Sequence, residues 1–166
     1  IDDPLIRYAA RIGFEHQIAS GSPLVIKNTD GSSPALVIAK LTALIHSDPK
    51  QASQILIDLD KLALKNLPVA WLESALQVYR LCLPALSAVE KSRARGTLRT
   101  LFPHRSTVIN RPLAELLLRL EDSGATPATL SLLREAPGQH DRMLYLVLLR
   151  NANIGWTLAL RREYFQ

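Results

Sequence analysis

Apolar residues recur at three- and four-residue spacing along most of the chain, which is the pattern of amphipathic helices packed against one another. No segment alternates apolar and polar residues for long enough to predict a strand. Prolines and polar connectors divide the pattern into about nine helices of roughly 10–16 residues. We therefore expect an all-α fold made of short antiparallel helices.

Several of the predicted helices begin with a polar residue followed by proline. The polar side chain accepts a hydrogen bond from a free N–H of the first turn, and proline suits the first helical position. The four clear pairs are Asp3-Pro4, Ser33-Pro34, Asp48-Pro49 and Thr126-Pro127. Asn110 before Arg111-Pro112 is a looser signal, Leu67-Pro68 is a start without a polar cap, and Gly124 is the expected C-terminal cap of the helix over 110–121.

The inward faces follow from the spacing of the apolar residues. We expect Leu5, Tyr8, Ala9 and Ile12 to point inward in the first helix, Leu36, Val37, Leu41, Leu44 and Ile45 in the second, and Leu144, Val147 and Leu148 in the helix over 140–151. The inward residues expected of the intervening helices are Ala52, Ile55, Leu56, Leu59, Leu62 and Ala63 after Pro49, Trp71, Leu72, Ala75, Leu76, Tyr79 and Leu83 after Pro68, and Leu113, Leu116, Leu117 and Leu120 in the helix over 110–121. The stretch 20–33 is rich in Ser, Gly and Asn and is predicted to be a loop.

Successive helical hairpins without a long central helix favour a solenoid over a four-helix bundle. The hairpins recur every 35–45 residues or so, which is near the range of HEAT repeats. We therefore predict a right-handed α-α superhelix of the HEAT or ARM type, as a single domain over residues 1–166. The chain begins at Ile1 without an initiator Met, so we expect either a processed protein or, as the HEAT-like pattern favours, a fragment of a larger protein.

Parts of the chain resemble a known family. DPLIRYAARIGFEH (Asp3 to His16) is similar to the start of a HEAT repeat. Three later stretches resemble the HEAT-like region of large planctomycete-type multidomain proteins: LFPHRSTVINRPLAELLLRLEDSGA (Leu101 to Ala125), Thr129 to Arg150, and NIGWTLALRREYF (Asn153 to Phe165). In that family the region lies between a dehydrogenase-like β-propeller and a haem-binding cytochrome c domain.

The resemblance implies a scaffold from an exported or periplasmic, membrane-associated redox protein, with no catalytic residue in this segment. The C-x-x-C-H haem attachment motif of the neighbouring domain is absent from this chain. We therefore expect no haem, quinone or other cofactor here. No apolar run approaches the roughly 18 residues of a membrane span, so we predict no transmembrane segment.

Motifs of enzymes and metal sites are missing from the sequence. The four histidines are too far apart to place two ligands on one helix face, and no phosphate-binding glycine loop or nucleophile elbow occurs. Asp58 and Asp60 are a close acidic pair, but residues two apart diverge by about 200° on a helix. Cys82, the single cysteine, lies in an apolar run and is predicted to be a buried, inert thiol. We expect no enzyme activity and no metal site.

The net charge of +5 is carried entirely by residues 67–166, which hold thirteen Lys and Arg and eight Asp and Glu. Lys91, Arg95 and Arg99 recur at four-residue spacing, so they share one helix face, and Arg105 and Arg111 extend it. This basic face is a candidate for binding phosphate, although a solvated face, or ion pairs to Glu90 and neighbouring helices, explains it more simply.

Two tryptophans and one arginine each allow two roles. We expect Trp71 and Trp156 to pack in the core, with an exposed partner anchor as the alternative. Arg80, within an apolar helix, either pairs with a buried carboxylate or extends to the surface.

The sequence favours a non-enzymatic scaffold that binds a protein or spaces flanking domains of the same chain. The alternative is a nucleic-acid-binding helical repeat that uses the basic face.

Overall fold

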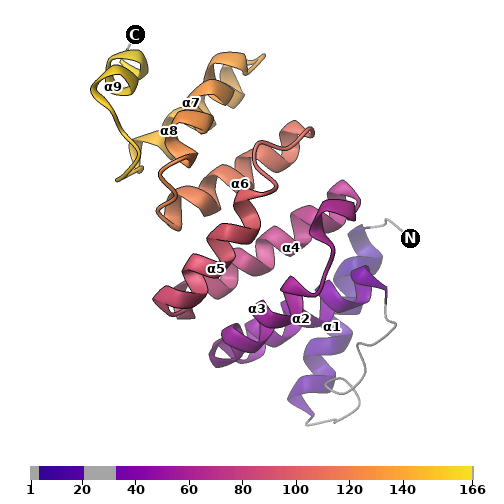
Figure 1. Ribbon diagram of the computed structural model, residues 1–166. Coiled ribbons are helices and arrows are strands. Elements are labelled where there is room, and N and C mark those ends of the chain that lie inside the picture. Colours follow the sequence, from indigo (N-terminus) through magenta and orange to yellow (C-terminus); the bar gives the residue numbers. More distant parts are fainter. Residues whose placement is uncertain (1–3, 21–32, 166) are drawn as a thin grey trace. The chain divides into compact units, whose positions relative to one another are not determined.

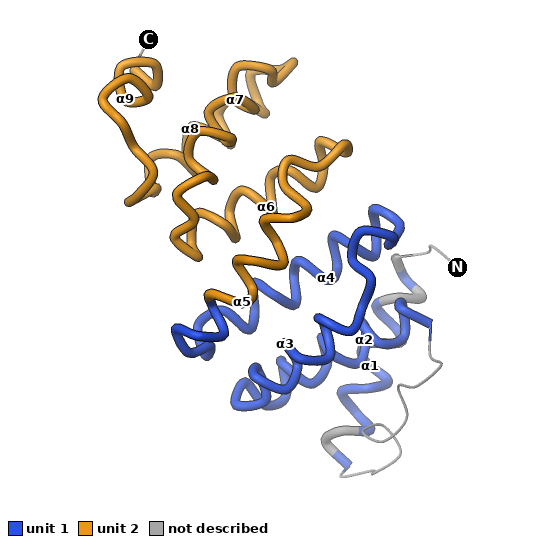
Figure 2. Tube along the Cα trace, in the orientation of Figure 1, with its two compact units in different colours: residues 1–91 blue, residues 92–166 orange. Residues whose placement is uncertain are grey.

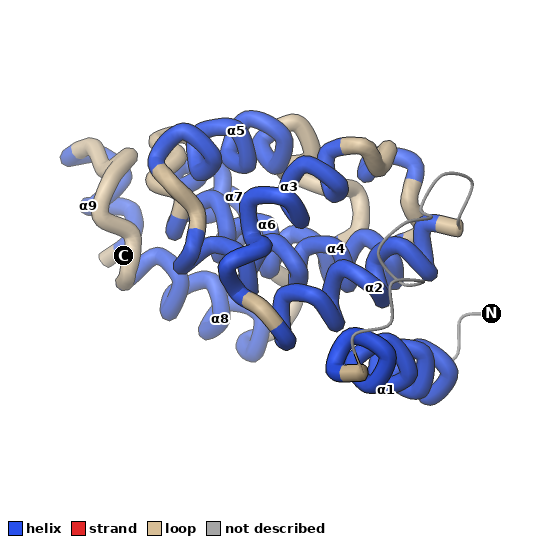
Figure 3. Tube along the Cα trace, turned by 90° about the horizontal axis from the view of Figure 1, so that it is seen from below, coloured by secondary structure: helices blue, strands red, loops and turns tan. Residues whose placement is uncertain are grey.

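A computed structural model describes residues 4–20 and 33–165, and in these residues every regular element is a helix and none is a strand (Figures 1 and 3). The α-helices are α1 (Pro4–Ala19), α2 (Pro34–Ser47), α3 (Ala52–Asp60), α4 (Val69–Cys82), α5 (Ala88–Arg99), α6 (Thr107–Arg119), α7 (Ala125–Glu135), α8 (Gln139–Arg150) and α9 (Leu158–Tyr164). Short 3₁₀ turns cover Pro49–Gln51, Leu64–Asn66 and Leu83–Ala85. The all-α prediction is confirmed, and the superhelical arrangement stays a prediction.

The chain divides into two compact units, residues 1–91 and 92–166, and the division falls inside α5 (Figure 2). In the first unit α1 packs against α2, and α4 packs against α2 and α3. In the second unit α6, α7 and α8 pack against one another, and α9 packs against α7. The prediction of one solenoid domain over residues 1–166 stays a prediction.

Leucine and isoleucine side chains fill the interior of each unit. The fully buried large residues of the first unit are Ile38, Leu41, Ile55, Leu56, Leu59, Leu72, Leu76 and Tyr79, and those of the second include Leu98, Ile109, Leu113 and Leu116. Burying one such side chain contributes about 1.5–3 kcal/mol. The apolar faces predicted for α3, α4 and α6 are therefore mostly confirmed.

The prediction for α1 is wrong, because Leu5 and Tyr8 are 76% and 57% exposed and Ala9 is also exposed. Ile12 is half-buried. The apolar stripe of α1 is wider than the part that α2 covers. In α2, Leu36 is exposed instead of buried, and Lys40 is a buried residue that sequence analysis missed.

The predicted helix starts had mixed outcomes. The Ser33 side chain accepts from the Leu36 N–H at 3.4 Å, and Asp48 accepts from the Lys50 N–H at 3.1 Å. Both caps are confirmed, although Asp48 opens a 3₁₀ turn that leads into α3. Asp3 lies outside the described residues. Pro68 precedes α4 as expected, and Pro84 lies in the turn that follows this helix.

Thr126 and Asn110 do not cap helices. Both residues are buried inside α7 and α6, where their side chains hold other segments. The Thr126 hydroxyl donates to the Ile154 carbonyl oxygen at 2.6 Å. The Asn110 amide donates to the His104 carbonyl oxygen at 2.9 Å and accepts from the His104 N–H at 2.6 Å. The preceding segment at Asn110 and a distant segment at Thr126 therefore take these side chains in place of the capping role.

A capping box that sequence analysis missed begins α5. The backbone N–H and hydroxyl of Ser87 both donate to Glu90 Oε2, at 2.8 and 2.6 Å, and the Glu90 N–H donates back to Ser87 Oγ at 3.4 Å. Ser53 on α3 also donates to this carboxylate. Together these bonds lower the pKa of Glu90 to about 2, with the Ser53 bond making the largest contribution.

The residue that follows the C-cap of α6 is Glu121, whose φ of 55° lies in the left-handed region. The Glu121 N–H donates to Leu118 O at 3.1 Å and the Asp122 N–H to Leu117 O at 2.9 Å, as in a Schellman motif. The prediction that Gly124 caps this helix is wrong, because Gly124 has a φ of −81° and precedes α7.

Candidate interaction surface

Two residues of the predicted basic face bind the turn that follows α6. Arg95 Nη1 donates to the carbonyl oxygens of Leu120 and Glu121 at 3.4 and 3.3 Å, and Arg95 Nη2 donates to Ser92 Oγ at 3.3 Å. These carbonyls are the free acceptors at the C-terminus of α6, where a cation is also favoured by the helix dipole. Arg95 therefore supports the fold of the second unit.

Arg99 engages the same turn through a buried acid. Its Nη1 lies 3.4 Å from Oδ2 of Asp122, whose side chain is 3% exposed. Oδ1 of Asp122 accepts from the Gly124 N–H at 2.8 Å, so both carboxylate oxygens have partners. A Cβ on Gly124 would lie 2.9 Å from Arg99 Nη2, so a larger residue here would require the end of the Arg99 side chain to shift. Arg99 thus pairs with an acid of the turn between α6 and α7, and not with Glu90 or with an acid on a neighbouring helix.

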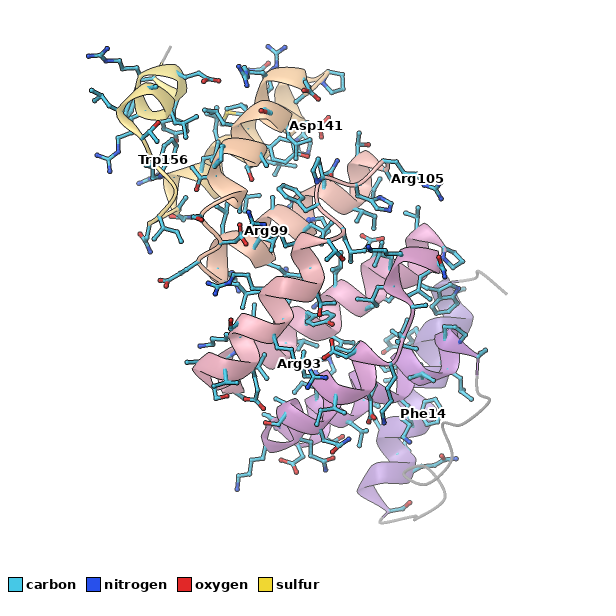
Figure 4. The ribbon with its side chains drawn as sticks, in the orientation of Figure 1. Phe14, Arg93, Arg99, Arg105, Asp141 and Trp156 are labelled. Carbon is cyan, nitrogen blue, oxygen red and sulfur yellow. The ribbon has the colours of Figure 1, made fainter. Side chains whose placement is uncertain are left out.

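Lys91 and Arg105 are exposed and take no part in these hydrogen bonds. The Arg105 side chain points away from the helices, in the segment that leads into α6 (Figure 4). Arg111 is also exposed, and its positive charge acts on Tyr145 of α8. Burial raises the pKa of Tyr145, with Asp141 adding to the rise and Arg111 opposing it. Arg95 and Arg99 thus both bind the turn after α6, whereas Lys91 and Arg105 take no part in binding it.

The outward side of α8 is apolar, contrary to the sequence prediction. Val147, expected to face inward, is 54% exposed, and Met143 one turn earlier is also 54% exposed. The buried residues of α8 are instead Tyr145 and Leu149. Leu144 and Leu148 are half-buried. Residues 143–149 are all apolar, so their spacing does not select which side of α8 faces inward.

The last helix, α9, carries a second exposed apolar pair. Leu158 is 69% exposed and Phe165 is 82% exposed. Sequence analysis missed both as surface residues, although their spacing of seven residues places them on one helix face.

Polar and aromatic contacts hold α9 against the rest of the second unit. The Tyr164 hydroxyl donates to the Leu146 carbonyl oxygen at 3.3 Å, and Arg134 Nε lies 3.1 Å from Glu163 Oε1. The rings of Trp156 and Tyr164 meet edge-on with their centroids 5.5 Å apart, and Trp156 Nε1 donates to the Ala152 carbonyl oxygen at 2.9 Å. Figure 4 shows Trp156 in the connector that precedes α9. Trp156 thus has a packing role, while remaining half-buried like Trp71.

The remaining candidate chemistry is structural in the described residues. Cys82 is fully buried, and burial raises its pKa to about 12, as the prediction of an inert thiol requires. Asp58 pairs with Lys61 at 2.7 Å, whereas Asp60 accepts from the Tyr79 hydroxyl at 3.2 Å, so the two acids serve separate partners. Arg80 is exposed, which is the second of its two predicted roles.

The histidines and carboxylates do not assemble into a metal site in the part of the chain that the structure describes. His16, His46 and His140 are exposed, and His104 Nδ1 accepts from the Ser106 N–H at 3.0 Å. No helix among the described residues has the length and apolar character that crossing a membrane requires.

Comparisons with protein-family models, with curated proteins and with solved structures found no match to this chain.

Proposed function

We propose that this chain is a non-enzymatic helical module that binds a protein segment, either in a separate protein or in flanking domains of the same chain. The observation that carries the proposal is the set of exposed apolar side chains on α1 in the first unit and on α8 and α9 in the second. Leu5, Tyr8, Met143, Val147, Leu158 and Phe165 are each more than half exposed. Large apolar side chains that gather at the surface mark interaction sites in soluble proteins.

The polar groups support the same reading. Arg95, Arg99 and Asp122 hold the turn after α6, and Glu90 caps α5. These residues already serve the fold, so they are poor candidates for acid–base chemistry on a substrate. The planctomycete-type resemblance fits a module of this kind, because it implies a scaffold between other domains.

Panning a random peptide library on the purified chain tests the proposal. We expect enriched peptides to share a pattern and to bind in calorimetry with a Kd of about 1–100 μM, the strength of a small transient interface. The control is a variant with Leu5, Tyr8, Met143, Val147, Leu158 and Phe165 all changed to serine. Peptides that fail to converge, or that bind this control equally well, would contradict the proposal.

Nucleic acid is the weaker candidate partner. The second unit has a net charge of +5, which favours phosphate, but Arg95 and Arg99 are engaged within the unit. Titration with duplex DNA at two salt concentrations decides the matter, because phosphate contacts are strongest at low salt. Absence of binding at the lower concentration removes this alternative.

A further inference from the structure

We propose that the outward surface of α8 and α9 binds an amphipathic helical segment whose apolar side is flanked by carboxylates. This inference rests on the proposed function and names the site and the chemistry of the partner. We call the site the α8–α9 surface and define it by Met143, Val147, Arg150, Leu158, Arg162 and Phe165.

Each helix presents its three residues on one face. Met143, Val147 and Arg150 follow the i, i+4, i+7 spacing on α8, and all three are exposed. Leu158, Arg162 and Phe165 follow the same spacing along α9 and its C-terminal cap, and they too are exposed. Both helices therefore combine two apolar side chains with one arginine on their outward side.

A side-chain hydrogen bond joins α9 to α8 within the second unit. The Tyr164 hydroxyl lies 3.3 Å from the Leu146 carbonyl oxygen. Val147 directly follows Leu146 in the chain, and Phe165 directly follows Tyr164. The ring centroids of Tyr164 and Phe165 are 5.1 Å apart. Val147 and Phe165 are thus the chain neighbours of the two residues that join the helices, and both lie in one compact unit. An apolar face laid against such a surface is a recurring mode of helix recognition.

The charge of the second unit selects an acidic partner. Residues 92–166 contain eleven arginines, no lysine and six acidic residues. Arg150, Arg161 and Arg162 are exposed on or beside the stripes. A guanidinium group pairs with a carboxylate through two parallel hydrogen bonds, which a lysine cannot do.

The same charge argues against two other occupants. A second copy placed on this surface would bring arginines against arginines, which is unfavourable. Single-stranded nucleic acid needs a series of aromatic side chains for stacking, whereas three of the four apolar residues here are the aliphatic Met143, Val147 and Leu158. A protein segment with leucine-like and acidic side chains matches both features of the surface.

The test uses a designed 18-residue helical peptide with leucines at i, i+4 and i+7 flanked by glutamates, labelled for fluorescence polarisation. The comparison peptides replace every glutamate with lysine or scramble the order. We expect the glutamate peptide to bind the full chain at least about tenfold more tightly than either comparison peptide, a ratio within the reach of charge complementarity.

Four variants locate the binding. Met143→Ser with Val147→Ser should weaken binding about tenfold, and Arg150→Glu with Arg162→Glu should weaken the glutamate peptide and improve the lysine peptide. Val108→Ser and Arg105→Glu are matched controls, since Val108 is 56% exposed and Arg105 is exposed outside the surface. Circular dichroism melting of each variant confirms that it is folded.

Equal binding of the glutamate and lysine peptides, or no binding of either, would overturn the inference. Oligothymidine that displaces the labelled peptide more strongly than unlabelled glutamate peptide does would overturn it in favour of nucleic acid. A wild-type dimer that dissociates in the double serine variant would overturn it in favour of a second copy of the chain. In each of these cases convergent peptides from library panning would leave the proposed function standing, so the two failures are distinguishable.

Discussion

Arg95 donates a hydrogen bond to the carbonyl oxygen of Glu121, the residue that closes α6 in the left-handed conformation. The bond joins the middle of α5 to the end of α6, both within the second unit from Ser92 onward. An arginine that sequence spacing assigns to a binding face thus stabilises a helix end.

Replacing Arg95 with alanine should therefore lower the stability of the protein. The loss should be about 1 kcal/mol, because the bonds come from a charged group that is partly exposed to solvent. Urea denaturation monitored by circular dichroism measures it. Arg105→Ala is the control and should leave the midpoint unchanged, since Arg105 is exposed. Equal effects of the two substitutions would refute the structural role of Arg95.

Replacing Glu121 with glycine should stabilise the protein. A non-glycine residue with a φ of 55° carries a steric cost of about 1 kcal/mol that glycine lacks. The gain should be somewhat smaller, since glycine also increases the entropy of the unfolded chain. Glu121→Ala serves as the comparison, because it keeps the Cβ and so gains nothing. A fall in the melting temperature of the glycine variant would count against the Schellman geometry.

Two glycines should respond in opposite ways to alanine. Gly155 has a φ of 79°, and a Cβ there would lie 2.5 Å from the Ser123 carbonyl oxygen, so Gly155→Ala should destabilise by about 1–3 kcal/mol. Gly96 lies within α5 with nothing within 4 Å of its Cβ position, so Gly96→Ala should stabilise by about 0.5–1 kcal/mol. Thermal unfolding of both variants checks the pair, and a shared sign would contradict the prediction.

Stability should fall on acidification partly through Glu90. Its pKa is about 2 in the folded protein against an ordinary value of 4.5, so folding favours the ionised form. The contribution is therefore fully present above about pH 4.5 and is lost as the pH falls toward 2. The difference in unfolding free energy between the wild type and Glu90→Gln should be largest at neutral pH and shrink between these values. A difference that is constant from pH 7 to pH 2 would refute it.

Cys82 should resist thiol reagents in the native protein. Its side chain is 0% exposed and its pKa is about 12, so neither access nor ionisation favours reaction at pH 8. A chromogenic disulfide reagent should label one thiol only after urea unfolds the chain. Rapid labelling without denaturant would show that the interior around α4 opens readily.

The sequence predicts the helices well because their signals are local. Ser33 and Asp48 cap the turns that follow them, and the apolar spacing of α6 buries Leu113 and Leu117 as expected. The failures arise where distant partners decide. Thr126 has a capping sequence, yet its hydroxyl is taken by Ile154, 28 residues away.

The candidate surface was harder to predict for a related reason. On α8, leucines, a tyrosine, a valine and a methionine surround the helix, so periodicity alone does not choose the buried side. Only the packing of α8 against α6 and α7 places Tyr145 inside and Val147 outside. Similarly, Arg95 and Arg99 are recognisable as one helix face, but their partners in the turn at 120–122 depend on how α5 and α6 are brought together.

The attachment of α9 has a dynamic consequence. This helix contains no buried residue and is held by the Tyr164 hydrogen bond, the ion pair of Glu163 and the edge-on contact with Trp156. Such a helix opens at a small fraction of the global unfolding free energy, while α6 and its buried leucines stay folded. Its amide hydrogens therefore exchange with solvent before those of α6, and a partner that docks on α8 and α9 must first restrict this local opening, at an entropic cost to its affinity.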